Sequence, residues 1–578
     1  MTVTTYPTAW AAVADHVSAC GVETVFGLPG DDLTLLTPYA RDATRVVLCR
    51  DQRNAAFMAT GYALASGRPG VCVLGSGPAV TNALTGVLEA RAARVPLIVY
   101  AGGTGAAQVG TGAHQELDQV AVMRPLTKWA VRVEHPDRVA PVLDRATLVA
   151  TAGTPGPVYV ELPGPVASGA VTRTAPWRTG PAQHPAPAPD VLAASYRTVR
   201  AAGRVLVLVG GGARHRNPDG SIERFASALG AGIAATASGR GVVDERHPLF
   251  CGLSGLYAPP PLAALWERAD LVVALGSRLE ETATFGWPDR AVPVVQIIVS
   301  ERDVATDRPG MAVLADVAHT VAGWLRLAER EPPAPDPGWR DQVTRARADA
   351  YAIAADRVAA GHDGPGVAVT AVLSALDRVV PPDRVLVQEN GLQDMWSYFF
   401  PYWSCGPAAG SVVASEQTSL GFAAAAAVGV ACADPARPVV ALVGDGAFNL
   451  VRSELPTLAN LDVAVLYVVL DNGGYGWLQA NLHRRLGPGS RFSFLTAGTS
   501  AAHTGAVHTR VTDPGGCGAA LREAWAACAA GRSAVVVVDV DIRDVPPGME
   551  DLAGGFPATG TAGDQVRTGS FVASGGED

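Results

Sequence analysis

Two short apolar runs, each followed at once by a glycine-rich turn, constrain the fold of this chain most. Residues 439–443 (VVALV) precede the turn 444–446 (GDG), and residues 463–470 precede the turn 471–476 (DNGGYG). Apolar runs of this length that end at a glycine turn and lead into a helical stretch are typical of buried parallel strands. Because the carboxyl ends of parallel strands meet at one edge of a sheet, we expect the two turns to lie together.

The same alternation of short apolar runs and helical stretches recurs along the 578 residues. It predicts an α/β protein built from doubly wound parallel sheets. Two proline-rich stretches divide the chain, and their composition is typical of linkers. We therefore predict three domains, at residues 1–174, 190–330 and 365–548, joined by linkers at 175–189 and 331–364. The remaining segment, 549–578, is rich in Gly, Ser and Thr, and we expect it to be a disordered tail.

Bulk composition excludes several classes of partner. The net charge of −9 argues against nucleic acid or an anionic membrane as the main partner. The chain shows no signal-peptide pattern and no apolar run long enough to span a membrane. Its eight cysteines are scattered without a CxxC pair, which favours free thiols in a reducing compartment. These features predict a cytoplasmic protein that acts on small molecules.

The two glycine turns carry residues suited to a metal-bound diphosphate. A diphosphate needs a cation to offset its charge, and small hard cations take oxygen ligands from carboxylates, amides and backbone carbonyls. Asp445 and Asn472 supply such oxygens, while the glycines allow the backbone to approach the phosphates. A helix starting near Ala447 would point its amide end at them. A lone GDG would favour ordinary strand–helix turns, but the pair at this spacing favours a diphosphate site.

At these turns the sequence resembles the thiamin diphosphate enzymes, in the branch that holds acetohydroxyacid synthase, benzaldehyde lyase and glyoxylate carboligase. In that family GDG is followed, after about 25–30 residues, by an asparagine that completes the metal site. The resemblance implies that Asp445, Asn472 and the carbonyl of Gly474 bind Mg²⁺. It also implies cofactor contacts from Gly444, Gly446, Ala447 and Tyr475.

Two further segments of the last domain share the resemblance. Residues 389–396 (ENGLQDMW) are similar to the segment that reaches the diphosphate in acetohydroxyacid synthase, which implies a polar contact from Gln393. Residues 419–422 (SLGF) are similar to the turn whose bulky residue bends the cofactor. The resemblance gives that role to Leu420, with the carbonyl of Thr418 accepting from the aminopyrimidine. The alternative for Leu420 is an ordinary core leucine.

The first domain carries the other half of the resemblance. Residues 26–30 (FGLPG), 76–82 (SGPAVTN) and 114–119 (HQELDQ) are similar to the pyrimidine-binding domain of the family. This implies that Gln115 faces the substrate. His114, beside it, could relay a proton, although a polar residue packed in a loop is the alternative. The implied cofactor contacts in this domain are Pro29, Gly30, Gly77 and Asn82.

One position departs from the family pattern. The family places a catalytic glutamate nine residues before a Gly-Tyr pair, where it protonates the pyrimidine ring and so starts formation of the thiazolium ylide. Counting back nine residues from Gly61 gives Gln52. An amide can hydrogen-bond the ring nitrogen but cannot give it a proton, and general acid–base catalysis contributes about 10²–10⁴-fold. Glyoxylate carboligase shows that the family tolerates a non-acid here.

Two other acids, Asp51 and Glu416, are candidate substitutes for that glutamate. Asp51 adjoins Gln52, but in an extended segment its side chain points to the opposite face unless the backbone bulges. Glu416 precedes the turn that carries Thr418, and a solvated or helix-capping role is the more usual one for such a glutamate. Neither residue restores the family pattern by itself.

The middle domain contains two strand-to-glycine turns, 206–212 (LVLVGGG) and 271–278 (LVVALGSR). Some relatives bind FAD in this domain and others leave it empty. Glycine turns of this kind are often only structural, so FAD is possible but not favoured.

The resemblance implies an enzyme that decarboxylates a 2-oxo acid and transfers the acyl-anion equivalent to a carbonyl acceptor. Two alternatives stay open. One is plain 2-oxo acid decarboxylation, or cleavage of an acyloin or dicarbonyl compound. The other is a cofactor-binding homologue with reduced catalysis, because Gln52 replaces the acid. As in the family, the active sites should lie between subunits of a homodimer or homotetramer.

Overall fold

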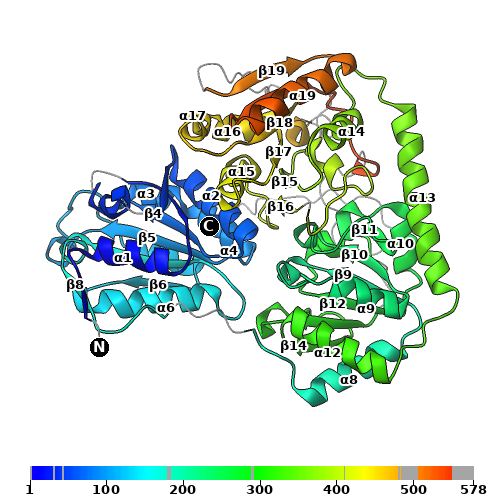
Figure 1. Cartoon of the computed structure of the whole chain (residues 1–578), viewed down its shortest axis with the longest axis horizontal. Coiled ribbons are helices and arrows are strands. Elements are labelled where there is room, and N and C mark those ends of the chain that lie inside the picture. Colours follow the sequence, from blue (N-terminus) through cyan, green and yellow to red (C-terminus); the bar gives the residue numbers. More distant parts are fainter. Residues whose placement is uncertain are drawn as a thin grey trace, which may run out of the picture.

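The computed structural model describes residues 3–29, 33–41, 44–178, 184–287, 292–408, 410–479, 482 and 505–549. Gly30 and the predicted tail from residue 550 onward lie outside these ranges. The described residues form three domains, each a six-stranded sheet covered by helices (Figure 1). The predicted fold class, three doubly wound parallel-sheet domains, is confirmed. No helix in this described part is both long and apolar enough to cross a membrane.

The first domain contains a parallel sheet in the order β3-β2-β4-β5-β7-β6. Its strands are β2 (Thr24–Leu28), β3 (Arg45–Leu48), β4 (Gly70–Leu74), β5 (Leu97–Gly103), β6 (Trp129–Arg132) and β7 (Val158–Pro163). The covering helices include α1 (Ala9–Ala19), α2 (Gln52–Ser66), α3 (Pro78–Asn82), α4 (Leu84–Ala92), α5 (Gln119–Met123), α6 (Val139–Thr151) and α7 (Gly164–Ala167). A short antiparallel pair, β1 (Thr4–Tyr6) and β8 (Val171–Arg173), ties the ends of the domain together.

The middle domain has the sheet order β11-β10-β9-β12-β13-β14. Its strands are β9 (Val205–Val209), β10 (Gly232–Ala235), β11 (Phe250–Leu253), β12 (Leu271–Leu275), β13 (Val294–Ile298) and β14 (Gly310–Leu314), and its helices include α8 (Pro189–Ala201), α9 (Ser221–Leu229), α10 (Pro260–Trp266) and α12 (Val317–Arg330). The segment expected to be a linker, 331–364, contains the 22-residue helix α13 (Trp339–Ala360). Trp339 and Val343 of α13 are buried in the middle-domain core, so this helix packs as part of that domain.

The third domain has the sheet order β16-β15-β17-β18-β20-β19. Its strands are β15 (Val385–Gln388), β16 (Ser411–Val413), β17 (Val439–Gly444), β18 (Leu466–Asp471), β19 (Val507–Val511) and β20 (Ala534–Asp539), and its helices include α14 (Val369–Val379), α15 (Phe422–Ala433), α16 (Asp445–Val451), α17 (Leu455–Leu458) and α19 (Pro514–Ala529). Helix α16 begins at Asp445, two residues before the expected start near Ala447. Gly444 is extended there (φ −76°, ψ 160°), so the helix starts directly at the strand end.

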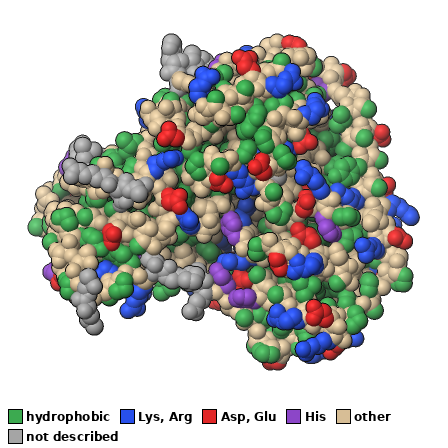
Figure 2. Space-filling model, viewed as in Figure 1, with side chains coloured by type: hydrophobic (Ala, Val, Ile, Leu, Met, Phe, Trp, Pro, Cys, Tyr) green, Lys and Arg blue, Asp and Glu red, His purple; other side chains and the backbone are tan. Residues whose placement is uncertain are grey.

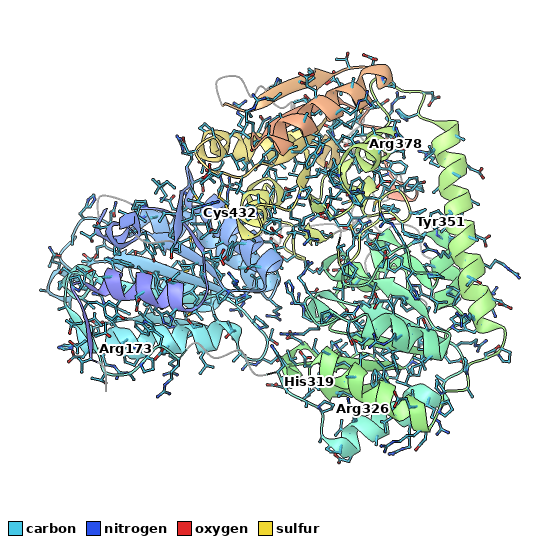
Figure 3. All side chains as sticks on the ribbon, in the orientation of Figure 1. Arg173, His319, Arg326, Tyr351, Arg378 and Cys432 are labelled. Carbon is cyan, nitrogen blue, oxygen red and sulfur yellow. The ribbon has the colours of Figure 1, made fainter. Side chains whose placement is uncertain are left out.

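Helices α2 and α15 join the first and third domains by a backbone-to-backbone contact. A Cβ atom on Gly61 of α2 would lie 2.3 Å from the carbonyl oxygen of Ala426. A Cβ atom on Gly429 of α15 would lie 1.8 Å from the carbonyl oxygen of Met58. The glycines therefore permit this crossing, beside which Cys432 of α15 is labelled in Figure 3. The contact fixes how the first and third domains lie against each other within one chain.

Candidate active site

The carboxyl edge of the third sheet gathers the residues that the sequence singled out. In the register of the sheet Gln388 of β15 pairs with Leu442 of β17, and Gly444 of β17 pairs with Leu470 of β18. The residues that follow these three strands therefore meet at one edge. They include Gln393 after β15, Asp445 after β17 and Asn472 after β18.

Two of these residues contact each other directly. The side-chain amide of Asn472 donates to Oε1 of Gln393 at 2.6 Å. The amide of Gln393 in turn donates to the carbonyl of Ile542 at 2.9 Å, and the N–H of Gly474 donates to Oδ1 of Asn472 at 3.0 Å. The candidate metal ligand Asn472 is thus oriented from both sides, by the predicted diphosphate contact Gln393 and by the turn that contains Gly474.

Two carboxyl groups are buried where β17 meets α16. Asp445 is only 2% exposed, and Asp394 is fully buried. Oδ2 of Asp394 accepts from the N–H groups of Gly391 (3.1 Å) and Gly444 (3.0 Å). Burial, opposed by these hydrogen bonds and reinforced by the charge of Asp445, raises the pKa of Asp394 to about 7. Sequence reasoning assigned Asp394 no role, although it lies within the segment 389–396 that carried the resemblance.

These groups fit a small hard cation. Carboxylate, amide and carbonyl oxygens at one edge are the ligands that Mg²⁺ takes, and a divalent charge would offset the buried carboxyl groups. Among the described residues, no group of three or more His, Cys, Asp or Glu side chains could hold a metal ion. Any metal here therefore depends on a mixed set such as Asp445, Asn472 and the Gly474 carbonyl.

The first turn of α16 allows the ring of Tyr475 to approach its backbone closely. A Cβ atom on Gly446 would lie 2.7 Å from a ring carbon of Tyr475, so only glycine lets this ring lie against the helix start. Tyr475 is nevertheless 39% exposed, whereas Ala447 is buried. Tyr475 therefore offers an apolar face at the same edge as Asp445.

The turn at 415–423 is held by two buried carboxylates from different domains. The N–H groups of Ser415 and Ser419 donate to Glu89 of α4 in the first domain, the second at 3.3 Å. The N–H of Ala423 donates to Glu389 at 3.0 Å. Burial and the nearby charge of Asp394 raise the pKa of Glu389 to about 8. Sequence reasoning missed Glu89, because its partners are backbone groups more than 300 positions away.

This turn presents the residues that the resemblance selected. Thr418 has φ +44°, a left-handed conformation that is uncommon for a non-glycine residue. Leu420 is 45% exposed rather than packed in the core. The interpretation of Leu420 as an ordinary core leucine is therefore wrong for this chain. Strain at Thr418 and an exposed leucine two residues later are typical of a segment shaped for a ligand.

Gln52 is the first residue of α2, and Asp51 is its N-cap. The Asp51 carboxylate accepts from the N–H of Arg53 at 2.8 Å. The Asn82 side-chain amide donates to Oε1 of Gln52 at 2.7 Å and to Oδ1 of Asp51 at 3.3 Å. The expectation that Asp51 points away from Gln52 is wrong, because the chain turns from strand into helix here. Asp51 is engaged in capping, and Gln52 and Asn82 are in direct contact.

In the same domain, the loop that contains His114 and Gln115 packs tightly against Gly77. Gly77 (φ +54°) and Gln115 (φ +57°) both have left-handed backbones, and a Cβ atom on Gly77 would lie 2.7 Å from the carbonyl oxygen of Gln115. Buried Gln119 fixes the crossing by accepting from the N–H of Gly77 at 2.6 Å. His114 is exposed on this loop. The structure thus brings Gly77 and Gln115 together, and Pro29 follows β2 at the same carboxyl edge.

Glu416 is not solvated. It accepts a hydrogen bond from the hydroxyl of Thr282 in the middle domain, and burial raises the pKa of its carboxyl group. The solvated interpretation fails because a neighbouring domain covers this side of the turn. Glu416 therefore ties the turn to the middle domain.

The two glycine turns of the middle domain pack against each other. The N–H of Gly212 donates to the carbonyl of Gly276 at 2.9 Å, and a Cβ atom on Gly210 would lie 2.5 Å from that oxygen. Mutual packing thus accounts for these glycines.

The molecular surface is hollowed where the first domain meets the other two, and arginine and histidine side chains gather there (Figure 2).

Comparison with protein families identifies the architecture. Three models of the thiamine pyrophosphate enzymes match the chain in order. The N-terminal TPP binding domain matches residues 7–122, the central domain matches 192–323 and the C-terminal TPP binding domain matches 391–540. This chain belongs to the thiamine pyrophosphate enzymes. Thiamine pyrophosphate is another name for thiamin diphosphate, so the family that the sequence resembled is confirmed.

Several relatives of this thiamine pyrophosphate enzyme are acetolactate synthase subunits. The acetolactate synthase large subunit of Corynebacterium glutamicum is 27% identical over 488 residues, which cover 81% of this chain and 75% of that protein. The large subunit of isozyme 1 from Escherichia coli is 27% identical over 472 residues, 79% of this chain and 80% of its own. The large subunit from Lactococcus lactis is 26% identical over 479 residues, 81% of each chain.

Proposed function

We propose that this thiamine pyrophosphate enzyme uses Mg²⁺ to form or break carbon–carbon bonds. It would decarboxylate a 2-oxo acid and transfer the acyl-anion equivalent to a carbonyl acceptor. The observation that carries the proposal is the meeting of Asp445 and Asn472 at the ends of adjacent strands, with Gln393 hydrogen-bonded to Asn472. The similarity to acetolactate synthases supports the reaction class.

The residues of the third domain would bind and orient the cofactor. Asp445, Asn472 and the Gly474 carbonyl would hold Mg²⁺, whose charge would offset that of the diphosphate. Leu420 would hold the cofactor in its bent shape, and the carbonyl of Thr418 would accept a hydrogen bond from the aminopyrimidine. When bound, the cofactor supplies the electron sink for cleavage next to a carbonyl group. The other diphosphate contacts in this proposal are Gln393, Gly444, Gly446, Ala447 and Tyr475.

The residues of the first domain would act on the pyrimidine side and on the substrate. Gln52, oriented by Asn82, can donate a hydrogen bond to a ring nitrogen but cannot transfer a proton to it. Gln115 and exposed His114 lie on the loop beside Gly77, where an imidazole can carry a proton to a substrate oxygen. Pro29 and Gly30 complete the proposed contacts of this domain.

We further propose that two copies of the chain complete each site, in a dimer or tetramer. Leu420 and Tyr475 leave apolar surface exposed at the carboxyl edge of a single chain, 45% and 39% of the two side chains. Exposed apolar groups beside a polar site are typical of an interface. Sedimentation of the protein as a monomer would contradict this assignment.

Gln52 favours a second candidate, a cofactor-binding homologue with reduced catalysis. Such a protein would keep the residues that bind the diphosphate, as this chain keeps Asp445 and Asn472, but would lack the catalytic glutamate, which is Gln52 here. Plain decarboxylation of a 2-oxo acid would use the same residues, with a proton in place of the carbonyl acceptor. Cleavage of an acyloin or dicarbonyl compound would use them on a different donor, in which a carbon–carbon bond breaks without loss of CO₂. FAD is not required by any step of this proposal.

One assay separates these functions. Purified protein is incubated with thiamine pyrophosphate, Mg²⁺ and pyruvate, and then with a panel of 2-oxo acids and acyloins. Release of CO₂ with acetolactate or acetoin supports the carboligase, whereas CO₂ with free aldehyde supports the decarboxylase. Absence of turnover across the panel would overturn the proposed reaction in favour of the binding homologue.

A further inference from the structure

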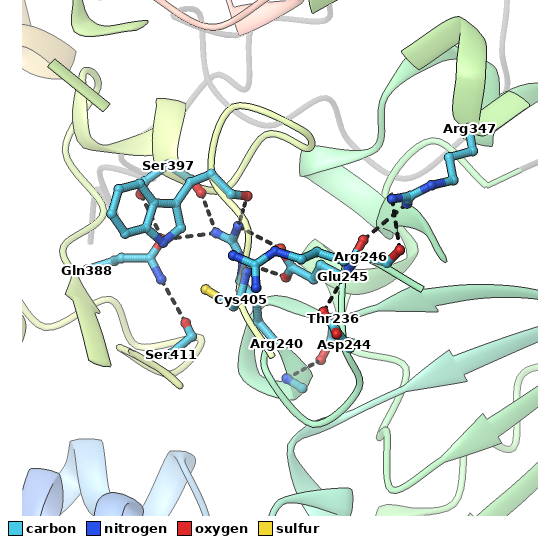
Figure 4. A network of polar contacts seen from close by, with 12 residues as sticks. Thr236, Arg240, Asp244, Glu245, Arg246, Arg347, Gln388, Ser397, Cys405 and Ser411 are labelled. Carbon is cyan, nitrogen blue, oxygen red and sulfur yellow. Dashed lines mark hydrogen bonds and ion pairs between the residues drawn. The ribbon is translucent and has the colours of Figure 1, made fainter. Parts of the chain in front are cut away.

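A fully buried arginine of the middle domain reaches the segment that carries Gln393. Arg240 follows a 3-10 turn, η7 (Ala237–Gly239), beyond β10. Its Nε donates to Oε1 of Glu245 at 2.8 Å, and its Nη2 donates to Oε2 at 3.1 Å (Figure 4). Neither side chain of this bidentate pair is exposed to solvent. The pair is therefore fully enclosed by protein.

The same guanidinium binds both ends of one segment of the third domain. Its Nη1 donates to Oε1 of Gln388, at the end of β15, at 3.2 Å, and also to the carbonyl of Ser397. Its Nη2 donates to the carbonyl of Trp403 at 2.7 Å. The residues between Gln388 and Ser397 include Gln393. Arg240 of the middle domain is thus hydrogen-bonded to both ends of the segment 388–397.

Third-domain groups complete the network. The single hydroxyl proton of Ser397 is shared between Oε1 of Gln388 at 2.7 Å and the carbonyl of Asp394 at 2.8 Å. The amide of Gln388 donates to Ser411 of β16 at 2.7 Å. Oε2 of Glu245 accepts from the N–H of Cys405 at 2.8 Å. Every polar atom of the Gln388 side chain is therefore used to hold the base of the loop.

We propose that Arg240, paired with Glu245, is a positioning residue for the cofactor site. It fixes the segment 389–396 so that Gln393 meets Asn472, the candidate metal ligand, at 2.6 Å. A planar guanidinium can span Glu245, Gln388 and two carbonyls at once, whereas an ammonium cannot. This inference rests on the proposed cofactor site, and it gives the middle domain a part in metal and cofactor binding.

The test must separate positioning from folding. Removing one partner of a buried ion pair is strongly destabilising, because the other charge is left unpaired. Replacing both partners by apolar residues of similar volume is often neutral or stabilising. The double variant Arg240→Met/Glu245→Leu therefore removes the donors to Gln388 and Ser397 without leaving a buried charge.

Two measurements are made on this variant. Hydrogen–deuterium exchange on the cofactor-free protein should become faster in 389–397 than in the rest of the third domain. The thermal midpoint should fall by less than in a variant that leaves one charge unpaired, although the N–H of Cys405 and the carbonyls of Ser397 and Trp403 lose their partners. Calorimetric titration with thiamine pyrophosphate and Mg²⁺ should give a Kd raised about 10–100-fold, the usual effect of losing a group that orients a metal ligand. Unchanged exchange and unchanged Kd would overturn the proposal.

A matched control uses another buried ion pair. Arg173 and Asp144 of the first domain lie 2.9 Å apart with 7% and 17% of their side chains exposed, and Figure 3 shows Arg173 far from the third domain. Arg173→Met/Asp144→Leu should change neither the exchange in 389–397 nor the Kd. An equal rise in Kd in this control would show a general effect and overturn the proposal.

A single variant keeps the test decisive if the double variant does not fold. Arg240→Lys retains a cation opposite Glu245 but loses the planar fork, so the Kd should rise and exchange in 389–397 should quicken. Wild-type values for both would overturn the proposal. Wild-type protein that binds no thiamine pyrophosphate would overturn the proposed function. The exchange measurement needs no cofactor, so it would still decide whether Arg240 orders the loop.

Discussion

At the scale of single residues, the groups proposed to bind the cofactor differ from the group proposed to activate it. Asp445 and Asn472 follow neighbouring strands, and the sequence identified them because a strand end and a glycine turn are local signals. Gln52 was found by counting from Gly61, which is also local. The sequence motif also indicates its partner Asn82, but their contact at 2.7 Å depends on where α2 and α3 lie in space.

Gln52→Glu should speed activation of the cofactor. A carboxyl group at this position can exchange a proton with the pyrimidine, and general acid–base catalysis is worth about 10²–10⁴-fold. Because Gln52 is the first residue of α2, a negative charge there also suits the helix dipole, so folding should not limit the variant. The measurement is proton–deuterium exchange at the thiazolium carbon of bound cofactor. Gln52→Ala is the control, and no acceleration in Gln52→Glu would contradict the role given to this position.

Glu389 should make the metal-free protein less stable as pH rises. Its pKa is raised to about 8 from an ordinary 4.5, so between these values the unfolded chain is ionised while the folded chain keeps its proton. The free energy of unfolding should then fall between about pH 5 and 8. Glu389→Gln should flatten this dependence in part, because Asp394 acts in the same direction. Urea unfolding across this pH range measures it, and an unchanged slope would refute the assignment.

Pairs of elements set the geometry between domains. Strands β17 and β18 were predicted from their apolar runs, with an error of three residues at the start of β18, because the apolar run 463–465 precedes the paired part of the strand. The crossing of α2 and α15 was not predicted. Glycines within an alanine-rich helix give no sign of their partner, and only the fold shows that Gly429 meets Met58.

Gly429→Ala should destabilise the contact between the first and third domains. The added methyl group would lie 1.8 Å from the carbonyl oxygen of Met58, so the helices must separate. Overpacking of this kind costs about 1–3 kcal/mol and occasionally more. Guanidinium unfolding measures the loss. Gly164→Ala is the matched control, since nothing lies within 4 Å of a Cβ atom there, and equal stability of the two variants would contradict the tight crossing.

Glu89→Ala should loosen the turn that carries Leu420. The N–H groups of Ser415 and Ser419 would lose their acceptor, and a buried unpaired donor costs about 1–3 kcal/mol. Both stability and affinity for thiamine pyrophosphate should fall. Asp316→Ala, which removes the cap of α12 in the middle domain, should lower stability alone. Unchanged cofactor affinity in Glu89→Ala would show that this carboxylate does not shape the site.

At the scale of the whole molecule, three sheets of similar topology are joined by contacts between domains. Three sheets of six parallel strands follow from the alternation of apolar runs and helices, which is why the fold class could be predicted. Interdomain contacts could not, because Glu89 and Arg240 bind backbone groups or amides far away in the chain. Helix α13 was not predicted for a related reason: its alanine-rich sequence with scattered charges follows a proline-rich stretch, and its burial depends on the middle-domain core.

Calorimetric titration of thiamine pyrophosphate tests the central claim most directly, namely that the edge around Asp445 and Asn472 holds the cofactor through a divalent metal. The wild-type protein should bind in the presence of Mg²⁺ and not in its absence. Asp445→Ala should lose this binding, whereas Asp434→Ala, at the exposed end of α15, should keep it. Binding of equal affinity without Mg²⁺, or in Asp445→Ala, would contradict the account.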